Sequence, residues 1–317
     1  TNPFVPAQEI IAVVDSSGSM KGTDPKNLRR TAIQTMVDAL ADNTVLSVVD
    51  FDDDAKVIIN REQLGAFAGS QRQKLKQKVG RLDSSGGTDV RKGLSAALNL
   101  MNASGEGNVT IVLLSDGKDG GGWQGEADGI PADVPVHAIA LSDQADRASL
   151  AKISSLTGGI YEIARTSYDL PRIIGRMFGE GDQKEILLVK QDKIKQGEVK
   201  RYVVSIEKID GGYVDVEVSW PGSDIDLTLI SPSGQRYSTG DAVAGGFCVE
   251  AETYDIIRLF KPIAGQWIME VEGVDIPAAD EPFTFRVSSL GGEVQTQWRT
   301  NFVTPELGQA LSFDLAT

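Results

Sequence analysis

An unbroken apolar run at residues 10–14 ends at a polar turn that is rich in serine. Five apolar residues without alternation predict a strand that is buried on both faces, as inside a parallel sheet. Asp15, Ser17 and Ser19 stand at alternate positions after this run, so in an extended turn their side chains point the same way. One carboxylate and two hydroxyls are hard oxygen ligands, which suit Mg²⁺, Ca²⁺ or Mn²⁺. The simpler alternative is a serine-rich turn that only caps the next helix.

Two distant segments carry side chains of the same chemical kind. Thr88 lies in the glycine-rich loop 84–89, which leads into an apolar pattern with helical spacing. Asp116 follows a second apolar strand at residues 109–114 and precedes a glycine. Each segment has a local explanation, which is a helix N-cap for Thr88 and a tight turn for Asp116. The combination of the three segments is more specific than any one of them.

The three motifs, Asp-x-Ser-x-Ser, Gly-Gly-Thr-Asp and Ser-Asp-Gly, occur in an order and spacing that resembles the von Willebrand factor type A family. The resemblance covers roughly the first half of the chain. It implies a metal-ion-dependent adhesion site whose ligands are Asp15, Ser17, Ser19, Thr88 and Asp116. It also implies that Mg²⁺, or else Mn²⁺ or Ca²⁺, is bound there, and that a Glu or Asp of a partner protein completes the ligand shell.

Apolar strands alternate with helical patterns from residue 10 to residue 178. This alternation predicts an α/β doubly wound, mostly parallel, Rossmann-like sheet with helices on both faces. Ligands in such sheets bind at the carboxyl ends of strands near the topological switch point, and Asp15 and Asp116 both follow strands. A short hairpin at 44–59 adds an edge strand. Its acidic triple at 52–54 is expected to solvate the turn, with a three-aspartate calcium loop as the alternative.

The pattern changes after a polar linker at residues 179–184. Five later segments alternate apolar and polar residues, with turns between them, namely 202–206, 213–220, 225–230, 266–271 and 283–287. That pattern predicts an all-β antiparallel sandwich or jelly roll. We therefore predict a type A domain at 1–180 and a β-sandwich at 181–317. This order resembles the CLCA family, in which a β domain follows a type A domain; the proteolytic activity of that family is not carried over to this sequence.

The composition narrows the class of protein. The 317 residues carry a net charge of -14, which argues against binding nucleic acid and against resting on an anionic membrane. No apolar run reaches the length of a membrane span. The single cysteine, Cys248, excludes an intrachain disulfide and a cysteine-ligated zinc site. The single histidine, His137, lies in an apolar strand and is expected to be a hydrogen-bonded core residue rather than a catalytic base.

The predicted metal site favours a non-enzymatic, metal-dependent adhesion or protein-binding module. A hydrolase that uses the metal to activate water would need a base, and the sequence does not provide one. We expect the module at a cell surface or outside the cell, with a cytoplasmic location as the alternative, since a single cysteine suits either. A regulatory or scaffolding subunit of a larger enzyme complex, as in metal chelatases, is the alternative function. We also expect the last helix of the first domain, at 170–178, to couple the metal site to the sandwich.

Overall fold

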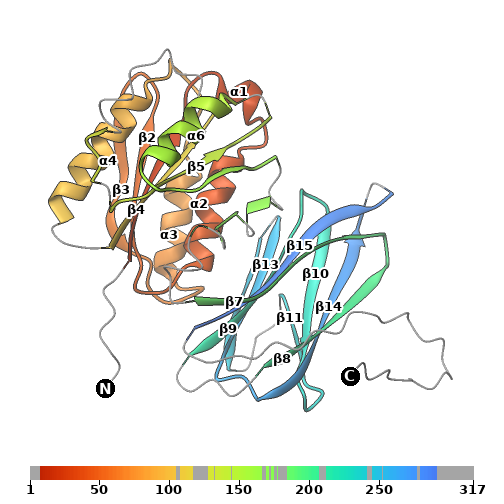
Figure 1. The fold of residues 1–317 in the computed structure, drawn as a ribbon. Helices are drawn as coiled ribbons and strands as arrows, with labels where there is room; N and C mark the ends of the chain where they lie inside the picture. Colours follow the sequence, from red (N-terminus) through yellow and green to blue (C-terminus); the bar gives the residue numbers. More distant parts are fainter. Residues whose placement is uncertain are drawn as a thin grey trace, which may run out of the picture.

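The computed structural model shows an α/β part and an all-β part that lie side by side (Figure 1). The structure describes residues 8–104, 108–116, 128–131, 133–143, 145–165, 169–170, 173–174, 177, 184–206, 212–240, 245–251, 253–276 and 279–290. Within these ranges, no helix is both long and apolar enough to cross a membrane.

A six-stranded sheet in the order β3-β2-β1-β4-β5-β6 forms the centre of the α/β part. Its strands are β1 (Gln8–Asp15), β2 (Val45–Phe51), β3 (Ala55–Gln63), β4 (Asn108–Ser115), β5 (Val136–Ala140) and β6 (Tyr161–Ile163). All neighbouring pairs are parallel except β2 and β3, which form an antiparallel hairpin at the edge. The predicted doubly wound, mostly parallel sheet with a hairpin edge is therefore confirmed.

Helices cover both faces of this sheet (Figure 1). They are α1 (Met20–Thr23), α2 (Leu28–Ala39), α3 (Ser70–Val79), α4 (Val90–Ser104) and α6 (Arg147–Leu156). Ile10, Ala12 and Val14 of β1 pack in the core that includes α2 and α3. Ile11 and Val13 pack in the opposite core with α4 and α6. The apolar run of β1 does not alternate because both of its faces are buried.

The predicted last helix of this part, at 170–178, lies largely outside the described residues. Leu170, Ile173, Ile174 and Met177 are described, and all four are buried in the core shared with α2 and α3. The proposed coupling role of this helix stays a prediction.

The single histidine is a core residue of β5, as predicted. His137 Nδ1 accepts a hydrogen bond from the backbone N–H of Ile160 at 2.9 Å. Burial lowers the pKa of His137 to about 4, so the imidazole is neutral at pH 7. A buried neutral ring with Nδ1 already bonded is not available as a base for surface chemistry.

Two antiparallel sheets make up the all-β part, in the orders β11-β10-β14-β8 and β12-β13-β9-β15-β7. Their strands are β7 (Lys184–Ile194), β8 (Val199–Ile206), β9 (Tyr213–Ser219), β10 (Asp224–Ile230), β11 (Arg236–Ser238), β12 (Gly246–Glu250), β13 (Tyr254–Phe260), β14 (Gly265–Asp275) and β15 (Glu281–Leu290). Side chains of both sheets pack in one core, which includes Trp220, Trp267 and Phe285. The predicted antiparallel sandwich is confirmed, whereas the exact domain boundary near residue 180 stays a prediction.

Candidate metal centre

β1 and β4 end next to each other at the point where the strand order reverses. From β1 the sheet continues to β2 on one side and to β4 on the other, so the carboxyl ends of β1 and β4 flank a topological switch point. Asp15 is the last residue of β1, and Asp116 directly follows β4. Both residues are fully buried. The fold thus brings together two carboxylates that are far apart in the sequence.

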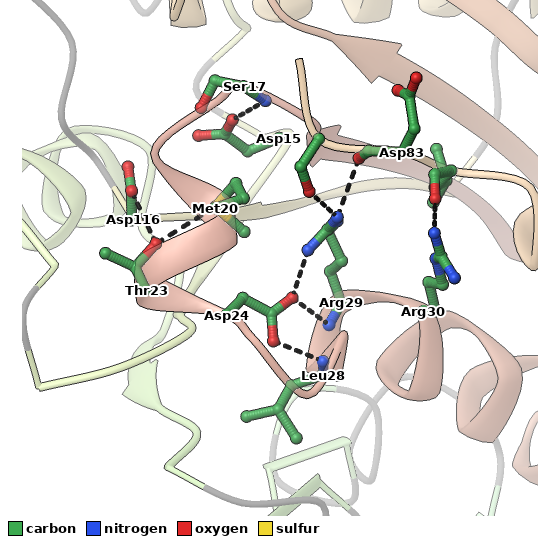
Figure 2. A network of polar contacts seen from close by, with 12 residues as sticks. Asp15, Ser17, Met20, Thr23, Asp24, Leu28, Arg29, Arg30, Asp83 and Asp116 are labelled. Atoms are coloured by element: carbon green, nitrogen blue, oxygen red, sulfur yellow. Dashed lines mark hydrogen bonds and ion pairs between the residues drawn. The ribbon is translucent and has the colours of Figure 1, made fainter.

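Hydrogen bonds fix the first of these carboxylates, Asp15 (Figure 2). Its Oδ1 accepts the backbone N–H of Ser17 at 2.9 Å, and its Oδ2 accepts the hydroxyl of Ser115 at 2.5 Å. The hydroxyl oxygens of Ser17 and Ser19 lie 3.0 Å apart. The carboxylate and both hydroxyls therefore gather at one place, as their alternate spacing predicts.

A threonine that the sequence analysis did not identify contacts the second carboxylate. Thr23 Oγ1 donates to Asp116 Oδ2 at 2.8 Å (Figure 2). The same hydroxyl lies 3.1 Å from the backbone oxygen of Ser19, the residue that precedes α1. Thr23 thus connects the serine-rich turn to the end of β4. Nothing in the sequence marks this threonine, whereas Ser115, the other hydroxyl that was missed, stands next to Asp116 in the Ser-Asp-Gly motif.

The electrostatics of the two carboxylates favour a bound cation. Burial raises the pKa of Asp15 to about 6, hydrogen bonds from Ser115 and Ser17 oppose this rise, and the charge of Asp116 adds to it. A divalent cation supplies the positive charge that two buried like charges need. In the described ranges, no group of three or more His, Cys, Asp or Glu side chains is suited to a metal, so a site here draws on hydroxyls as well as carboxylates. This donor set fits a hard cation such as Mg²⁺.

The glycine-rich loop 84–89 approaches the serine-rich turn closely. The backbone N–H of Gly18 donates to the backbone oxygen of Gly86 at 3.1 Å. A Cβ atom at Gly18 would lie 3.0 Å from that same oxygen, so this approach favours a glycine. Thr88 is half-buried on the same loop. The structure therefore places the Gly-Gly-Thr-Asp motif beside the Asp-x-Ser-x-Ser motif.

The acidic turn between β2 and β3 supports the same loop. The side chain of Asp52 accepts the backbone N–H of Asp54 at 2.9 Å, which closes the hairpin turn as predicted. The backbone oxygen of Asp52 also accepts the N–H of Asp89 at 2.8 Å. A Cβ atom at Gly87 would lie 2.2 Å from Asp53 Oδ1, so the acidic turn packs directly against the two glycines. The acidic triple therefore does more than solvate its own turn.

Asp24 and Arg29 form a fully buried ion pair, which the sequence analysis did not find (Figure 2). The pair lies between the end of α1 and the glycine-rich loop. The Asp24 carboxylate accepts the backbone N–H of Leu28 at 2.5 Å and Nη1 of Arg29 at 2.7 Å. Arg29 Nη2 donates to the backbone oxygen of Asp83 at 2.8 Å and to Ser84 Oγ at 2.5 Å. Asp24 therefore caps the start of α2, and Arg29 connects α2 to the glycine-rich loop.

Comparison with known proteins agrees with this geometry. Residues 8–163 match the sequence profile of the von Willebrand factor type A domain. The match supports a von Willebrand factor type A domain in this part of the chain, which we call the type A domain. The type A domain comprises the six-stranded sheet, its described helices and the candidate metal centre.

Two further proteins show how far the likeness extends. An uncharacterized protein of Synechocystis, sll0103, is 32% identical over 108 residues, which are 34% of this chain and 24% of that protein. The solved structure of a von Willebrand factor type A protein from Catenulispora acidiphila is 18% identical with a TM-score of 0.50, over 92% of this chain and 63% of that chain. This chain thus spans 24% of the first relative and 63% of the second. At 18% identity the second likeness is one of fold.

Proposed function

We propose that the type A domain binds one divalent cation and uses it to bind a partner protein. The observation that carries this proposal is the pair of buried carboxylates, Asp15 and Asp116, at the switch point of the sheet with hydroxyls beside them. Type A domains are generally protein-interaction modules, which is the class of function that such a site serves.

In this proposal two carboxylates and three hydroxyls hold the cation, namely Asp15, Ser17, Ser19, Thr88 and Asp116. Hydroxyl ligands carry no charge, so the site keeps a net attraction for an anionic oxygen. A Glu or Asp side chain of the partner protein is the ligand that suits an open position. Mg²⁺ is the proposed ion, with Mn²⁺ and Ca²⁺ as the alternatives.

We assign no catalytic step to this site. His137 is neutral and buried in the sheet, so it does not supply a base there. Type A domains are typically non-enzymatic interaction modules, and a binding role needs only the cation and its ligands.

Titration calorimetry with MgCl₂ on the full chain tests the metal site. We expect the wild type to bind one Mg²⁺ and Asp15→Ala to bind it at least tenfold more weakly, since about 1.4 kcal/mol corresponds to tenfold. Asp226→Ala removes an exposed carboxylate of the sandwich and serves as the matched control, which should bind as the wild type does. Equal Mg²⁺ binding by Asp15→Ala and the wild type would contradict the assignment.

Thr88→Ala separates the metal site from folding. Thr88 is half-buried on a glycine-rich loop, so its loss should leave the melting temperature within a few degrees of the wild type, since such changes usually cost under about 0.5 kcal/mol. The Mg²⁺ affinity should fall, because one neutral ligand is lost. Calorimetry and thermal unfolding of the same preparation measure both quantities. An unchanged Mg²⁺ affinity would remove Thr88 from the ligand set.

A further inference from the structure

The type A domain and the sandwich meet in a buried polar contact, which we call the joint and define by Asp38, Asp42, Phe67, Tyr254 and Arg258. Tyr254 Oη donates to Asp38 Oδ2 at 2.6 Å. Arg258 Nη1 donates to Asp42 Oδ1 at 2.9 Å, and its Cζ lies 4.0 Å from the centre of the Phe67 ring. Each contact pairs a residue of the type A domain with a residue of β13.

The centre of the joint is buried, whereas Asp42 lies at its edge with 43% of its side chain exposed. Phe67 is 1% exposed, Tyr254 3% and Arg258 0%, and an apolar cluster with Val249 and Ile256 surrounds them. A guanidinium and a phenol buried in this way need partners, because an unpaired polar group in such a place costs free energy. Tyr254 takes its partner, Asp38, from the type A domain, whereas Arg258 pairs with Asp215 of β9 and reaches Asp42 of the type A domain with its remaining Nη1. Contact between the two parts is therefore favoured over separation.

The helix that forms one side of the joint also starts beside the glycine-rich loop that carries Thr88. Backbone N–H groups in the first turn of α2 donate to the Asp24 carboxylate, and Arg29 connects the helix to the glycine-rich loop. Asp38 lies in its last turn, and Asp42 follows its end. α2 has twelve residues, so at a rise of 1.5 Å per residue it is about 18 Å long. One end contacts the glycine-rich loop, and the other end contacts the joint.

We infer that docking of the sandwich through Tyr254 and Arg258 and cation binding at the metal centre are thermodynamically linked through α2. The inference gives the sandwich a function of its own, which is to support the helix on which the metal-site loops are built. It rests on the proposed cation binding. If the cation favours the orientation of α2 to which β13 docks, docking must raise the cation affinity by the same factor, because linkage is reciprocal.

Hydrogen exchange of the full chain with and without saturating MgCl₂ tests the link without any substitution. We expect Mg²⁺ to slow exchange in the segments around Asp15 and Asp116 and also in β13, which contacts no metal ligand in the described structure. Slowing at the metal loops without any slowing in β13 overturns the link and leaves the proposed function intact. If Mg²⁺ gives no heat of binding and slows hydrogen exchange nowhere in the wild type, both the link and the proposed function are overturned.

A variant of the joint tests the reciprocal effect. Tyr254→Phe with Asp42→Asn removes the hydrogen bond to Asp38 and the ion pair with Arg258 across the joint, while Asp38 keeps Lys76 at 2.7 Å and Arg258 keeps Asp215 at 2.7 Å. The substitution also removes the ion pair of Asp42 with Arg72, which keeps its hydrogen bond to the backbone oxygen of Leu40 at 3.1 Å. We expect Mg²⁺ to bind at least threefold more weakly and the slowing in β13 to disappear.

Thr228→Val is the matched control for this variant, because it removes one side-chain hydrogen bond of the sandwich, to Ser238, in the sheet that lacks β13. It should keep the wild-type affinity and the slowing in β13. Tyr254→Phe alone serves if the double variant does not fold. Wild-type Mg²⁺ affinity in a folded joint variant overturns the link.

Discussion

Arg29→Met is expected to lower the free energy of unfolding by about 3–5 kcal/mol, because it leaves the buried Asp24 carboxylate without its ion-pair partner. Both side chains are fully buried, so water does not replace the lost guanidinium. The substitution also removes the hydrogen bonds to Asp83 and Ser84, which connect α2 to the glycine-rich loop. Urea unfolding followed by circular dichroism measures the loss.

The loss should depend on pH in a defined direction. Burial raises the pKa of Asp24, although the charge of Arg29 opposes the rise. Without Arg29 the pKa of Asp24 rises further, so the carboxyl group takes up a proton at a higher pH than in the wild type. A neutral carboxyl group needs no guanidinium. The deficit of Arg29→Met is therefore expected to be largest above neutral pH and to shrink as the pH falls.

Two companion variants make the Arg29 experiment specific. Arg147→Met removes an exposed arginine that pairs with Asp143, and it should change the free energy of unfolding by no more than about 0.5 kcal/mol. Asp24→Asn combined with Arg29→Met removes both charges, so it should regain part of the lost stability. An Arg29→Met protein as stable as Arg147→Met would show that the buried pair does not stabilise this fold.

The sheet and the positions of the first candidate ligands were predictable because their signals are local in sequence. The unbroken apolar run of β1 predicts burial on both faces, and both cores are present. Asp15 and Asp116 each follow such a run, and a parallel sheet places the ends of these strands at one edge. Alternate spacing then predicts that Ser17 and Ser19 lie beside Asp15. In the structure the Ser17 N–H lies 2.9 Å from Asp15 Oδ1, and the two serine hydroxyls lie 3.0 Å apart.

Contacts between distant residues were not predictable from pattern. Arg29 and Ser84 are 55 residues apart, and Tyr254 and Asp38 are 216 apart, so no spacing rule connects them. β13 was missed for a related reason. Strands with one solvated face alternate, but β13 is buried on the side of the sandwich core and on the side of the type A domain. The charged Arg258 of this strand is fully buried, because Asp215 of β9 and Asp42 of the type A domain both pair with it.

Asp255 of β13 lies in a buried environment that disfavours the charged form of its carboxyl group. It is 1% exposed, and its Oδ1 has no hydrogen-bond partner in the described structure. Burial raises the pKa of Asp255 to about 7, a hydrogen bond from Thr239 opposes the rise, and the charges of Glu250 and Asp226 add to it. Glu250 lies directly opposite on β12. The charged form of Asp255 therefore destabilises the sandwich.

The sign of the pH dependence follows from this raised pKa. Because the pKa of Asp255 is higher in the folded state than its ordinary value of 3.8, the folded state binds the proton more tightly than the unfolded state. The resulting stabilisation is fully present below about pH 4 and is lost as the pH rises through 7. A pKa difference of about three units corresponds to roughly 4 kcal/mol as an upper value.

Asp255→Asn cannot lose this stabilisation, because the amide does not titrate. Between pH 4 and pH 8 the free energy of unfolding of the wild type should therefore fall by about 2–4 kcal/mol relative to that of Asp255→Asn. Any pH-independent cost of the new amide cancels in this comparison, since it is the same at both pH values.

Urea unfolding at pH 4, 6 and 8 followed by the fluorescence of the tryptophans measures the difference. Asp275→Asn, at an exposed position of β14, is the matched control and should follow the wild type at every pH. Parallel pH profiles for Asp255→Asn and the wild type would mean that the charged form of Asp255 costs no free energy in the folded protein. The sandwich would then stabilise this carboxylate through contacts other than those described.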